Sequence, residues 1–123
     1  MEKIRFQIVF RKPRYPVVVV SKDKLCSAFE INQLANCCIS STPIDDKSYV
    51  QVIDSTGEEF WYNLEHYALS PGFAFKKWTK KKIIETYNNS SNARRINQKY
   101  SLKSLSSKRL DKIVYDICSL LRS

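Results

Sequence analysis

Glycine is scarce in this sequence. Gly57 and Gly72 are the only two glycines among 123 residues. Both common phosphate-binding motifs depend on glycine-rich loops that let the backbone approach the phosphates closely. The chain therefore carries neither of these motifs, and any phosphate site in it must be built differently.

Long hydrophobic runs are missing as well. The longest solid apolar run is Val17–Val20, whereas a membrane-spanning helix needs about 20 apolar residues. Met1–Arg11 alternates charged and apolar residues, so it has no continuous core of the kind found in signal peptides. We therefore expect no membrane insertion and a cytoplasmic location, where cysteines stay reduced.

The four cysteines lack the spacing of a metal site. Cys37 and Cys38 are adjacent, Cys26 comes eleven residues before Cys37, and Cys118 is remote. Structural zinc takes four ligands, typically from Cys-x-x-Cys pairs, and His66 is the single histidine. We interpret the cysteines as buried thiols that behave as small apolar side chains, and we expect no metal ion and no cofactor.

Catalytic patterns are weak too. Asp54 and Glu58 are better explained by their place in a turn, and His66 has no identifiable nucleophile as a partner. The full set of candidate acids and bases in the first 75 residues is Asp45, Asp46, Asp54, Glu58, Glu59 and His66. We expect no catalytic residue and no enzyme, and we keep a small metal-dependent enzyme as the last alternative.

Positive charge is abundant and unevenly placed. The chain has a net charge of +9, but residues 1–75 sum to −1 and residues 76–123 sum to +10. Such asymmetry is typical of proteins that bind a polyanion, most often nucleic acid. An acidic protein, an anionic membrane surface or a merely solvated basic tail would fit the same electrostatics.

β-strand patterns fill the first part of the chain. Apolar residues alternate with mostly polar ones over residues 4–10, which predicts a half-buried strand. Val17–Val20 predicts a strand that is buried on both faces. Two β-rich runs flank a turn within Tyr49–Tyr62 and predict a hairpin.

Residues 25–38 are ambiguous between helix and strand. Asp23 could cap a helix there, or a short turn could lead into a strand over Leu34–Ile39. We favour the strand, because the hairpin that follows needs partners. Ser70–Phe73 is expected to be a turn, given its proline and glycine.

Two helices are expected in the basic part of the chain. Thr79 fits an N-cap, and Trp78 and Ile83 have the spacing of a hydrophobic staple, which predicts a helix over about 79–88. The apolar residues of 107–121 follow a helical repeat, with Ser106 or Ser107 as the cap. Residues 89–105 between them are polar and unpatterned, and we interpret them as a linker.

The segment YVQVIDSTGEEFWYNLEHYALSPGF resembles small barrels of the Src-homology-three-like type. The resemblance rests on a strand, an Asp-Ser-Thr-Gly-Glu turn, an aromatic strand and a short segment that ends in proline. The resemblance covers roughly Val17 to Phe73. We therefore expect an α+β protein with a small, partly open antiparallel β-barrel or a curled sheet over residues 1–73. A basic helical extension over residues 74–123 would follow. Barrels of this type host unrelated functions, so the resemblance implies no activity.

The lysines around Trp78 are the strongest functional candidates. If Thr79 is the cap, Lys80–Lys82 occupy the first helical turn, where each cation costs about 0.3–1 kcal/mol. A sequence that breaks a local rule often does so at a functional place, and an anion there would gain both free N–H groups and ammonium charges. Solvated lysines on an ordinary helix are the alternative.

We therefore predict a non-catalytic, intracellular protein that binds nucleic acid, either DNA or RNA, or regulates through such binding. Its contacts would be mainly to phosphates. The residues expected to make them are Lys76, Lys77, Trp78, Lys80, Lys81, Lys82, Arg94 and Arg95. Trp61 could be a stacking platform, but we favour a place in the core or at its rim. The alternative is a protein-interaction module or homo-oligomer that uses the aromatic strands and the helix at 107–121.

Overall fold

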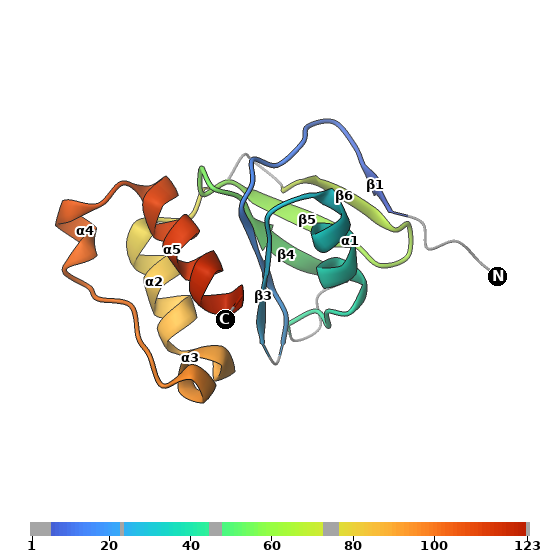
Figure 1. The fold of residues 1–123 in the computed structure, drawn as a ribbon. Helices are drawn as coiled ribbons and strands as arrows, with labels where there is room; N and C mark the ends of the chain where they lie inside the picture. The colour runs from blue at the N-terminus through green and yellow to red at the C-terminus, as the bar shows by residue number, and fades with distance from the viewer. Residues whose placement is uncertain (1–5, 23, 45–47, 73–76, 123) are drawn as a thin grey trace.

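The computed structural model describes residues 6–22, 24–44, 48–72 and 77–122. The fold is α+β, with one sheet between a single helix on one side and a group of helices on the other (Figure 1). The strands are β1 (Gln7–Ile8), β2 (Val17–Val20), β3 (Leu25–Ala28), β4 (Tyr49–Ile53), β5 (Glu59–Asn63) and β6 (Ala68–Pro71). The helices are α1 (Ile31–Ile39), α2 (Lys80–Asn88), α3 (Ser91–Ile96), α4 (Ser104–Ser107) and α5 (Leu110–Arg122).

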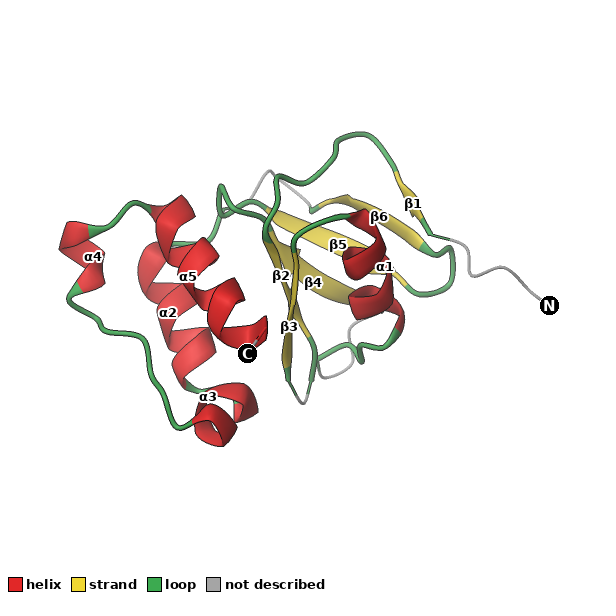
Figure 2. Ribbon diagram, in the orientation of Figure 1, coloured by secondary structure: helices red, strands yellow, loops and turns green. Residues whose placement is uncertain are grey.

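The sheet is open and mixed. Its six strands have the order β1-β6-β5-β4-β2-β3, and β1 runs parallel to β6 while every other pair is antiparallel. Figure 2 shows α2–α5 gathered near the β2–β3 end of this sheet and α1 on the opposite face. The predicted α+β class is confirmed. The Src-homology-three-like barrel is not, because the sheet does not close on itself.

Strand β2 contributes to two hydrophobic cores. Val17 and Val19 pack with α1 and the β4–β5 hairpin, whereas Val18 and Val20 pack with α2 and α5. All four side chains are at most 5% exposed, which confirms the predicted strand with both faces buried. Successive side chains of a strand point to opposite faces, so an unbroken apolar run is what a strand between two helical layers requires.

The predicted hairpin is confirmed. Strands β4 and β5 pair antiparallel from Tyr49↔Asn63 to Ile53↔Glu59. In the turn, Asp54 Oδ1 accepts hydrogen bonds from the backbone N–H groups of Thr56 at 2.9 Å and Glu58 at 3.1 Å. Gly57 has φ of 86°, in the left-handed region where a side chain is disfavoured. Turn chemistry therefore sets this register.

The strand favoured over Leu34–Ile39 is wrong, because helix α1 occupies those residues. The carboxylate of Glu30 accepts hydrogen bonds from the N–H groups of Asn32 and Gln33 and so caps the helix. Leu34, Cys37 and Cys38 are buried at the i, i+3, i+4 spacing of a helix face. Glu30 lies seven residues after Asp23, the residue that the sequence suggests as the cap. Asp23 itself is outside the described residues.

Two further predictions in the β region need correction. The described part of the strand expected over residues 4–10 is reduced to Gln7–Ile8, and Phe10 is 95% exposed with φ of 69°. The turn expected at Ser70–Phe73 is in part strand β6, in which Leu69 is paired with Tyr62 and fully buried. Pro71 is tolerated because it stands at the end of its strand.

The helix predicted over about 79–88 is confirmed, but the linker over 89–105 is not. Helices α3 and α4 lie within that range. The side chain of Asn88 accepts from the Tyr100 N–H at 2.7 Å and donates to the Tyr100 carbonyl at 3.0 Å. Asn92 Oδ1 accepts from the Leu25 N–H at 2.7 Å. Hydrogen bonds from side-chain amides thus hold this segment to the fold. Its sequence has no periodic apolar pattern from which the structure could be predicted.

Helix α5 begins at Leu110 rather than near residue 107. Ser106 and Ser107, the expected caps, belong to α4 instead. Its apolar stripe, which includes Ile113 and Ile117, is buried in the core beneath the sheet. Every helix in the described part of the chain is too short or too polar to cross a membrane.

The cysteines divide into two kinds. Cys26 and Cys37 form a disulfide that joins β3 to α1, so their interpretation as free thiols is wrong. Cys38 and Cys118 are free and buried, as interpreted, and burial raises the pKa of each thiol to about 12. Spacing alone could not show the bond, because the pair meets only once residues 31–39 become a helix.

Candidate nucleic-acid interface

On part of one sheet face, none of the described helices packs. Helix α5 packs on β2 and β3, and on this face the core it shares with α2 reaches only as far as Ile53 of β4. Beyond that point Gln51, Trp61 and Ser70 lie side by side on β4, β5 and β6. All three are partly exposed. The described helices therefore leave a surface of mixed aromatic and polar character on the sheet.

Two aromatic rings stack on this surface. The ring centroids of Tyr49 and Trp61 are 4.2 Å apart, and their planes differ by 18°. Both side chains are partly exposed, so Trp61 belongs to the rim of the fold rather than to its centre. Aromatic residues at such a position are a recurring feature of sheets that bind unpaired bases.

A buried carboxylate holds the tryptophan in place. Glu59 is 4% exposed, and its Oε2 accepts a hydrogen bond from Trp61 Nε1 at 2.6 Å. Its Oε1 accepts from Trp78 Nε1 at 2.7 Å and from Gln51 Nε2 at 3.4 Å. A buried charge is tolerated only with such partners. The two oxygens of the Glu59 carboxylate thus each hold one indole ring.

Trp78 connects the sheet to the lysines of α2. Its backbone N–H donates to the Gly57 carbonyl at 2.8 Å, and Lys77 forms a β-bridge with Glu58. The indole is only 5% exposed, and Lys82 Nζ lies 4.1 Å from its ring centroid. The sequence placed Trp78 among the contact residues. Because its indole is buried, Trp78 packs between the hairpin and the lysines and has a structural role.

The first turn of α2 gathers three cations. Thr79 Oγ1 accepts from the Lys82 N–H at 3.2 Å, which confirms the predicted N-cap. The turn has no acidic residue. Lys80 Nζ donates to the Leu105 carbonyl at 3.4 Å, and Lys81 pairs loosely with Glu85 at 3.8 Å. Lys77 stands just before this turn, and Lys76 lies outside the described residues.

The predicted arginines lie apart from these lysines. Arg94 and Arg95 are exposed residues of α3, which follows the C-terminal end of α2 (Figure 1). The nine residues of α2 span about 13 Å. Lys77 and Lys80–Lys82 are thus neighbours in the chain at the start of α2, with side chains that reach different partners, and the two arginines form a separate pair on α3.

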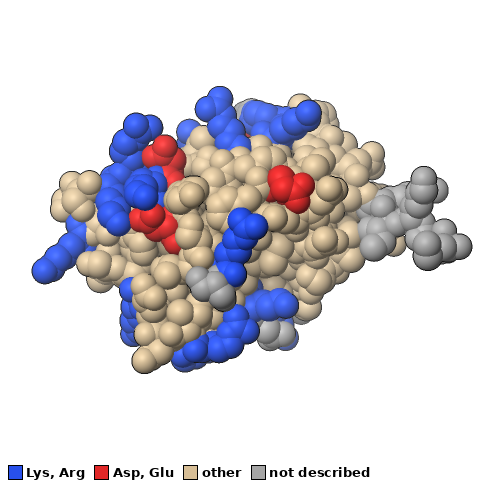
Figure 3. Space-filling model, viewed as in Figure 1, with Lys and Arg blue, Asp and Glu red and all other residues tan. Residues whose placement is uncertain are grey.

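Ion pairs neutralise Lys108, Arg109 and Lys112 around the start of α5, whereas among the described basic residues of α2 and α3 only Lys81 has a carboxylate partner. Asp116 pairs with Lys108 and Lys112, each at 3.0 Å, and Asp111 pairs with Arg109 at 3.4 Å. Figure 3 shows Lys and Arg atoms at several separate places on one face of the molecule, with acidic atoms beside one group. Among the described residues, no carboxylate lies within 4.0 Å of the cationic groups of Lys77, Lys80, Lys82, Arg94 or Arg95.

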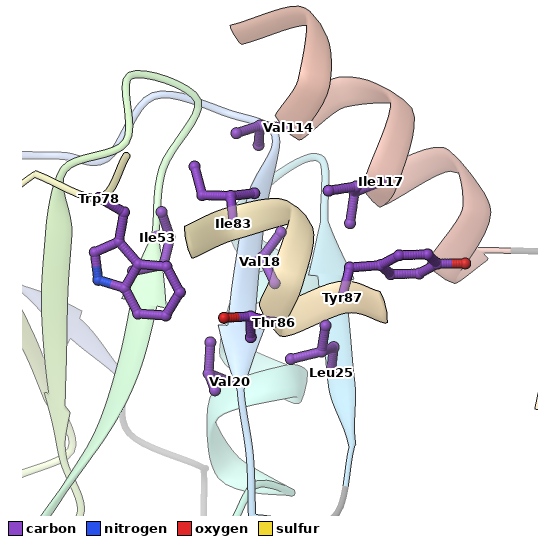
Figure 4. A pocket seen from close by; sticks show the side chains of 10 residues that line it. All are labelled: Val18, Val20, Leu25, Ile53, Trp78, Ile83, Thr86, Tyr87, Val114 and Ile117. Atoms are coloured by element: carbon purple, nitrogen blue, oxygen red, sulfur yellow. The ribbon is translucent and has the colours of Figure 1, made fainter. Parts of the chain in front are cut away.

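A pocket at the seam between α2, α5 and the sheet does not offer a second site. Figure 4 shows side chains such as Val18, Ile83 and Val114 converging there. Thr86 brings a hydroxyl to the lining, but that hydroxyl already donates to the Lys82 carbonyl at 2.7 Å. The pocket is a packing space within the core.

The candidate catalytic acids have structural partners. Asp54 Oδ2 accepts from the Arg14 N–H at 3.1 Å in addition to its bonds within the turn, and Glu58 forms an ion pair with Arg11. Asp45 and Asp46 lie outside the described residues. Within the described ranges, no three His, Cys, Asp or Glu side chains are grouped so that they could hold a metal ion.

Comparison with protein-family models, with curated proteins and with solved structures finds no match to this chain.

Proposed function

We propose that this chain is a non-catalytic nucleic-acid-binding or regulatory protein that grips phosphates with Lys77 and the first turn of α2. The observation that supports this most is the grouping of Lys77 and Lys80–Lys82 at a helix start without an acidic residue. Of the four, only Lys81 has a carboxylate within 4.0 Å among the described residues. Phosphate would relieve their mutual repulsion and complement the helix dipole.

The arginines of α3 would give a second phosphate contact. Arg94 and Arg95 are exposed and occupy the last turn of their helix, about one length of α2 away from the lysines. A polyanion that follows α2 would touch both groups. Binding of this kind is driven by counterion release and is independent of base sequence.

The protein-interaction alternative has less support. It rested on the aromatic strands and on the apolar stripe of residues 107–121, and that stripe is buried against the chain's own sheet. A cytoplasmic location is part of the proposal, since nucleic acid is accessible there. The Cys26–Cys37 disulfide would then be in a reducing compartment. Whether the bond is oxidised or reduced in cells therefore bears on the proposed location.

The test is the binding of a fluorescein-labelled single-stranded 20-mer of mixed sequence, measured by anisotropy across a salt series. The variant replaces Lys80, Lys81 and Lys82 with Ala. The matched control replaces Lys12, Lys22 and Lys24, three exposed lysines of the first part of the chain, so that both variants have a net charge of +6 instead of +9.

We expect the wild type to lose affinity steeply as salt rises. The α2 variant should reduce the slope of log K against log salt by about 2, because each phosphate contact contributes about 0.7 with a single strand. The control variant should leave most of the slope in place. Absent binding at low salt, a flat salt dependence, or equal losses in both variants would refute the proposal.

A further inference from the structure

We infer that Tyr49 and Trp61 form a stacking platform for unpaired bases, so that the ligand of this protein is single-stranded nucleic acid. This inference rests on the proposed function and adds the class of ligand to it. Phosphate contacts alone do not distinguish a duplex from a single strand, whereas a base can stack on a side chain only when it has left its own helix.

The platform lies in the part of the sheet on which none of the described helices packs. Trp61 stands in the central row of that surface, between Gln51 on β4 and Ser70 on β6. The ring of Tyr49 stacks on it face to face at a centroid distance of 4.2 Å, so a base would lie on an outer face of this pair. The neighbours on either side are polar and partly exposed, so hydrogen-bonding groups flank the rings where the edges of a stacked base would lie.

The platform is held rigidly. The 2.6 Å hydrogen bond from Trp61 Nε1 to the buried Glu59 fixes the orientation of the indole before any ligand arrives. A side chain that is already ordered loses less entropy on binding than a mobile one. A surface tryptophan held only by solvent would not have this advantage.

The platform also lies beside the cations. One carboxylate joins Trp61 to Trp78, with hydrogen bonds of 2.6 Å and 2.7 Å, and Lys82 Nζ lies 4.1 Å from the Trp78 ring. Bases on Trp61 would therefore be accompanied by phosphates near the first turn of α2. This combination of aromatic rings and a basic strip is the common design of proteins that bind single strands.

Charge complementarity favours nucleic acid over a protein as the occupant of this surface. Lys82 approaches it at one end through the ring of Trp78, and residues 76–123, which carry this lysine, have a net charge of +10. Partly exposed glutamine and serine side chains interrupt the aromatic area. An apolar protein surface would leave these polar groups without partners.

The experiment compares three labelled probes that bind in the same buffer at low salt. They are a 15-mer of deoxythymidylate, an abasic 15-mer with the same number of phosphates, and a 15-base-pair duplex. The protein is the full chain, as wild type and as the variants Tyr49→Leu and Tyr49→Phe. Tyr115→Leu is the matched control, because Tyr115 is a tyrosine of α5 that is 49% exposed.

We expect the wild type to bind the deoxythymidylate strand about tenfold or more tightly than the abasic strand, the size of effect that base–aromatic stacking gives. Tyr49→Leu should remove most of this preference and leave abasic binding unchanged. Tyr49→Phe and Tyr115→Leu should keep the preference. The comparison of probes on the wild type decides the matter even if Tyr49→Leu proves unstable.

The outcomes separate this inference from the proposal beneath it. Equal binding of the deoxythymidylate and abasic strands, or tighter binding of the duplex, would overturn the stacking platform while phosphate binding stands. Failure of all three probes to bind at low salt would overturn both.

Discussion

The carboxylate of Glu59 accepts a hydrogen bond from the indole nitrogen of Trp78, 19 residues later in the chain, at 2.7 Å. The other oxygen of the same carboxylate holds Trp61. One buried charge thus positions both the residue that precedes α2 and the ring proposed to receive bases. The candidate interface depends on this contact for its shape.

Replacing Glu59 with Gln should destabilise the fold by about 1–3 kcal/mol, because an amide cannot accept hydrogen bonds at both of its ends. One of the two indole N–H groups would then lose its acceptor. Urea unfolding followed by circular dichroism measures the change. The control is Glu65→Gln, at an exposed position in the turn between β5 and β6. Equal free energies of unfolding for the two variants would show that the Glu59 hydrogen bonds make no net contribution to stability.

Removing the helix cap should weaken α2. Thr79→Ala deletes the oxygen that accepts from the Lys82 N–H and should cost about 1 kcal/mol. The control is Thr42→Ala, since Thr42 is exposed and its bonds with Ser21 involve only its backbone. Thermal unfolding of both variants tests this prediction, which a loss no larger than that of the control would contradict.

Asp116 should make stability depend on acid pH. Partial burial acts to raise its pKa, but hydrogen bonds from Tyr100, Lys108 and Lys112 outweigh it and lower the pKa to about 2. Because the folded pKa lies below the ordinary value of 3.8, the contribution is complete above about pH 4 and is lost as pH falls toward 2. Asp116→Asn should therefore cost about 2 kcal/mol at pH 7.

The measurement is urea unfolding of the wild type and Asp116→Asn at pH 7 and again near pH 2.5. The difference between them should shrink at the lower pH. Asp111→Asn removes a carboxylate that is 51% exposed and should have a smaller effect at both pH values. A difference for Asp116→Asn that does not change with pH would contradict the assigned ion pairs.

The thiols should react in three distinct stages. Native protein should show no reactive thiol, because Cys38 and Cys118 are buried with pKa values raised to about 12. Unfolding should expose two thiols, and reduction after unfolding should give all four. Titration with a thiol reagent counts them. Four thiols in the unreduced, unfolded protein would show that Cys26 and Cys37 are not joined.

Loss of the disulfide should lower stability as well. The bond joins residues with a sequence separation of 11, and closing such a loop is worth about 3 kcal/mol. The double variant Cys26→Ser/Cys37→Ser should unfold at correspondingly lower urea concentration. Reduced wild type should match it, and an unchanged midpoint in both would contradict the prediction.

The sequence predicted those elements whose signals are local. The hairpin at Tyr49–Tyr62, the run Val17–Val20 and the cap at Thr79 each carry their own turn, periodicity or capping signal. The helix over Ile31–Ile39 was missed because its cap is a glutamate, outside the usual Ser, Thr, Asp and Asn. The helix α3 and the loop after it were missed because amide side chains, rather than an apolar stripe, hold them to the fold.

The candidate interface was foreseeable only in part. The charge of residues 76–123 and the first turn of α2 are visible as composition and spacing. The platform exists because Trp61 is on the face of β5 that is turned toward α2 and α5. The alternation of residues in a strand separates its two faces, but it does not show which helices pack on each face. The clue was the alternation of Glu59 and Trp61 with Phe60 and Tyr62, which puts a charge on the same face as an indole.

The four valines of β2 have a consequence for how the molecule loses its structure. Detaching α2 and α5 would bare Val18 and Val20 to water, while detaching α1 would bare Val17 and Val19. Loss of the helices on either face would therefore expose apolar side chains of β2 and destabilise the strand. Melting should accordingly be a single, all-or-none event in which helices and sheet vanish at the same temperature.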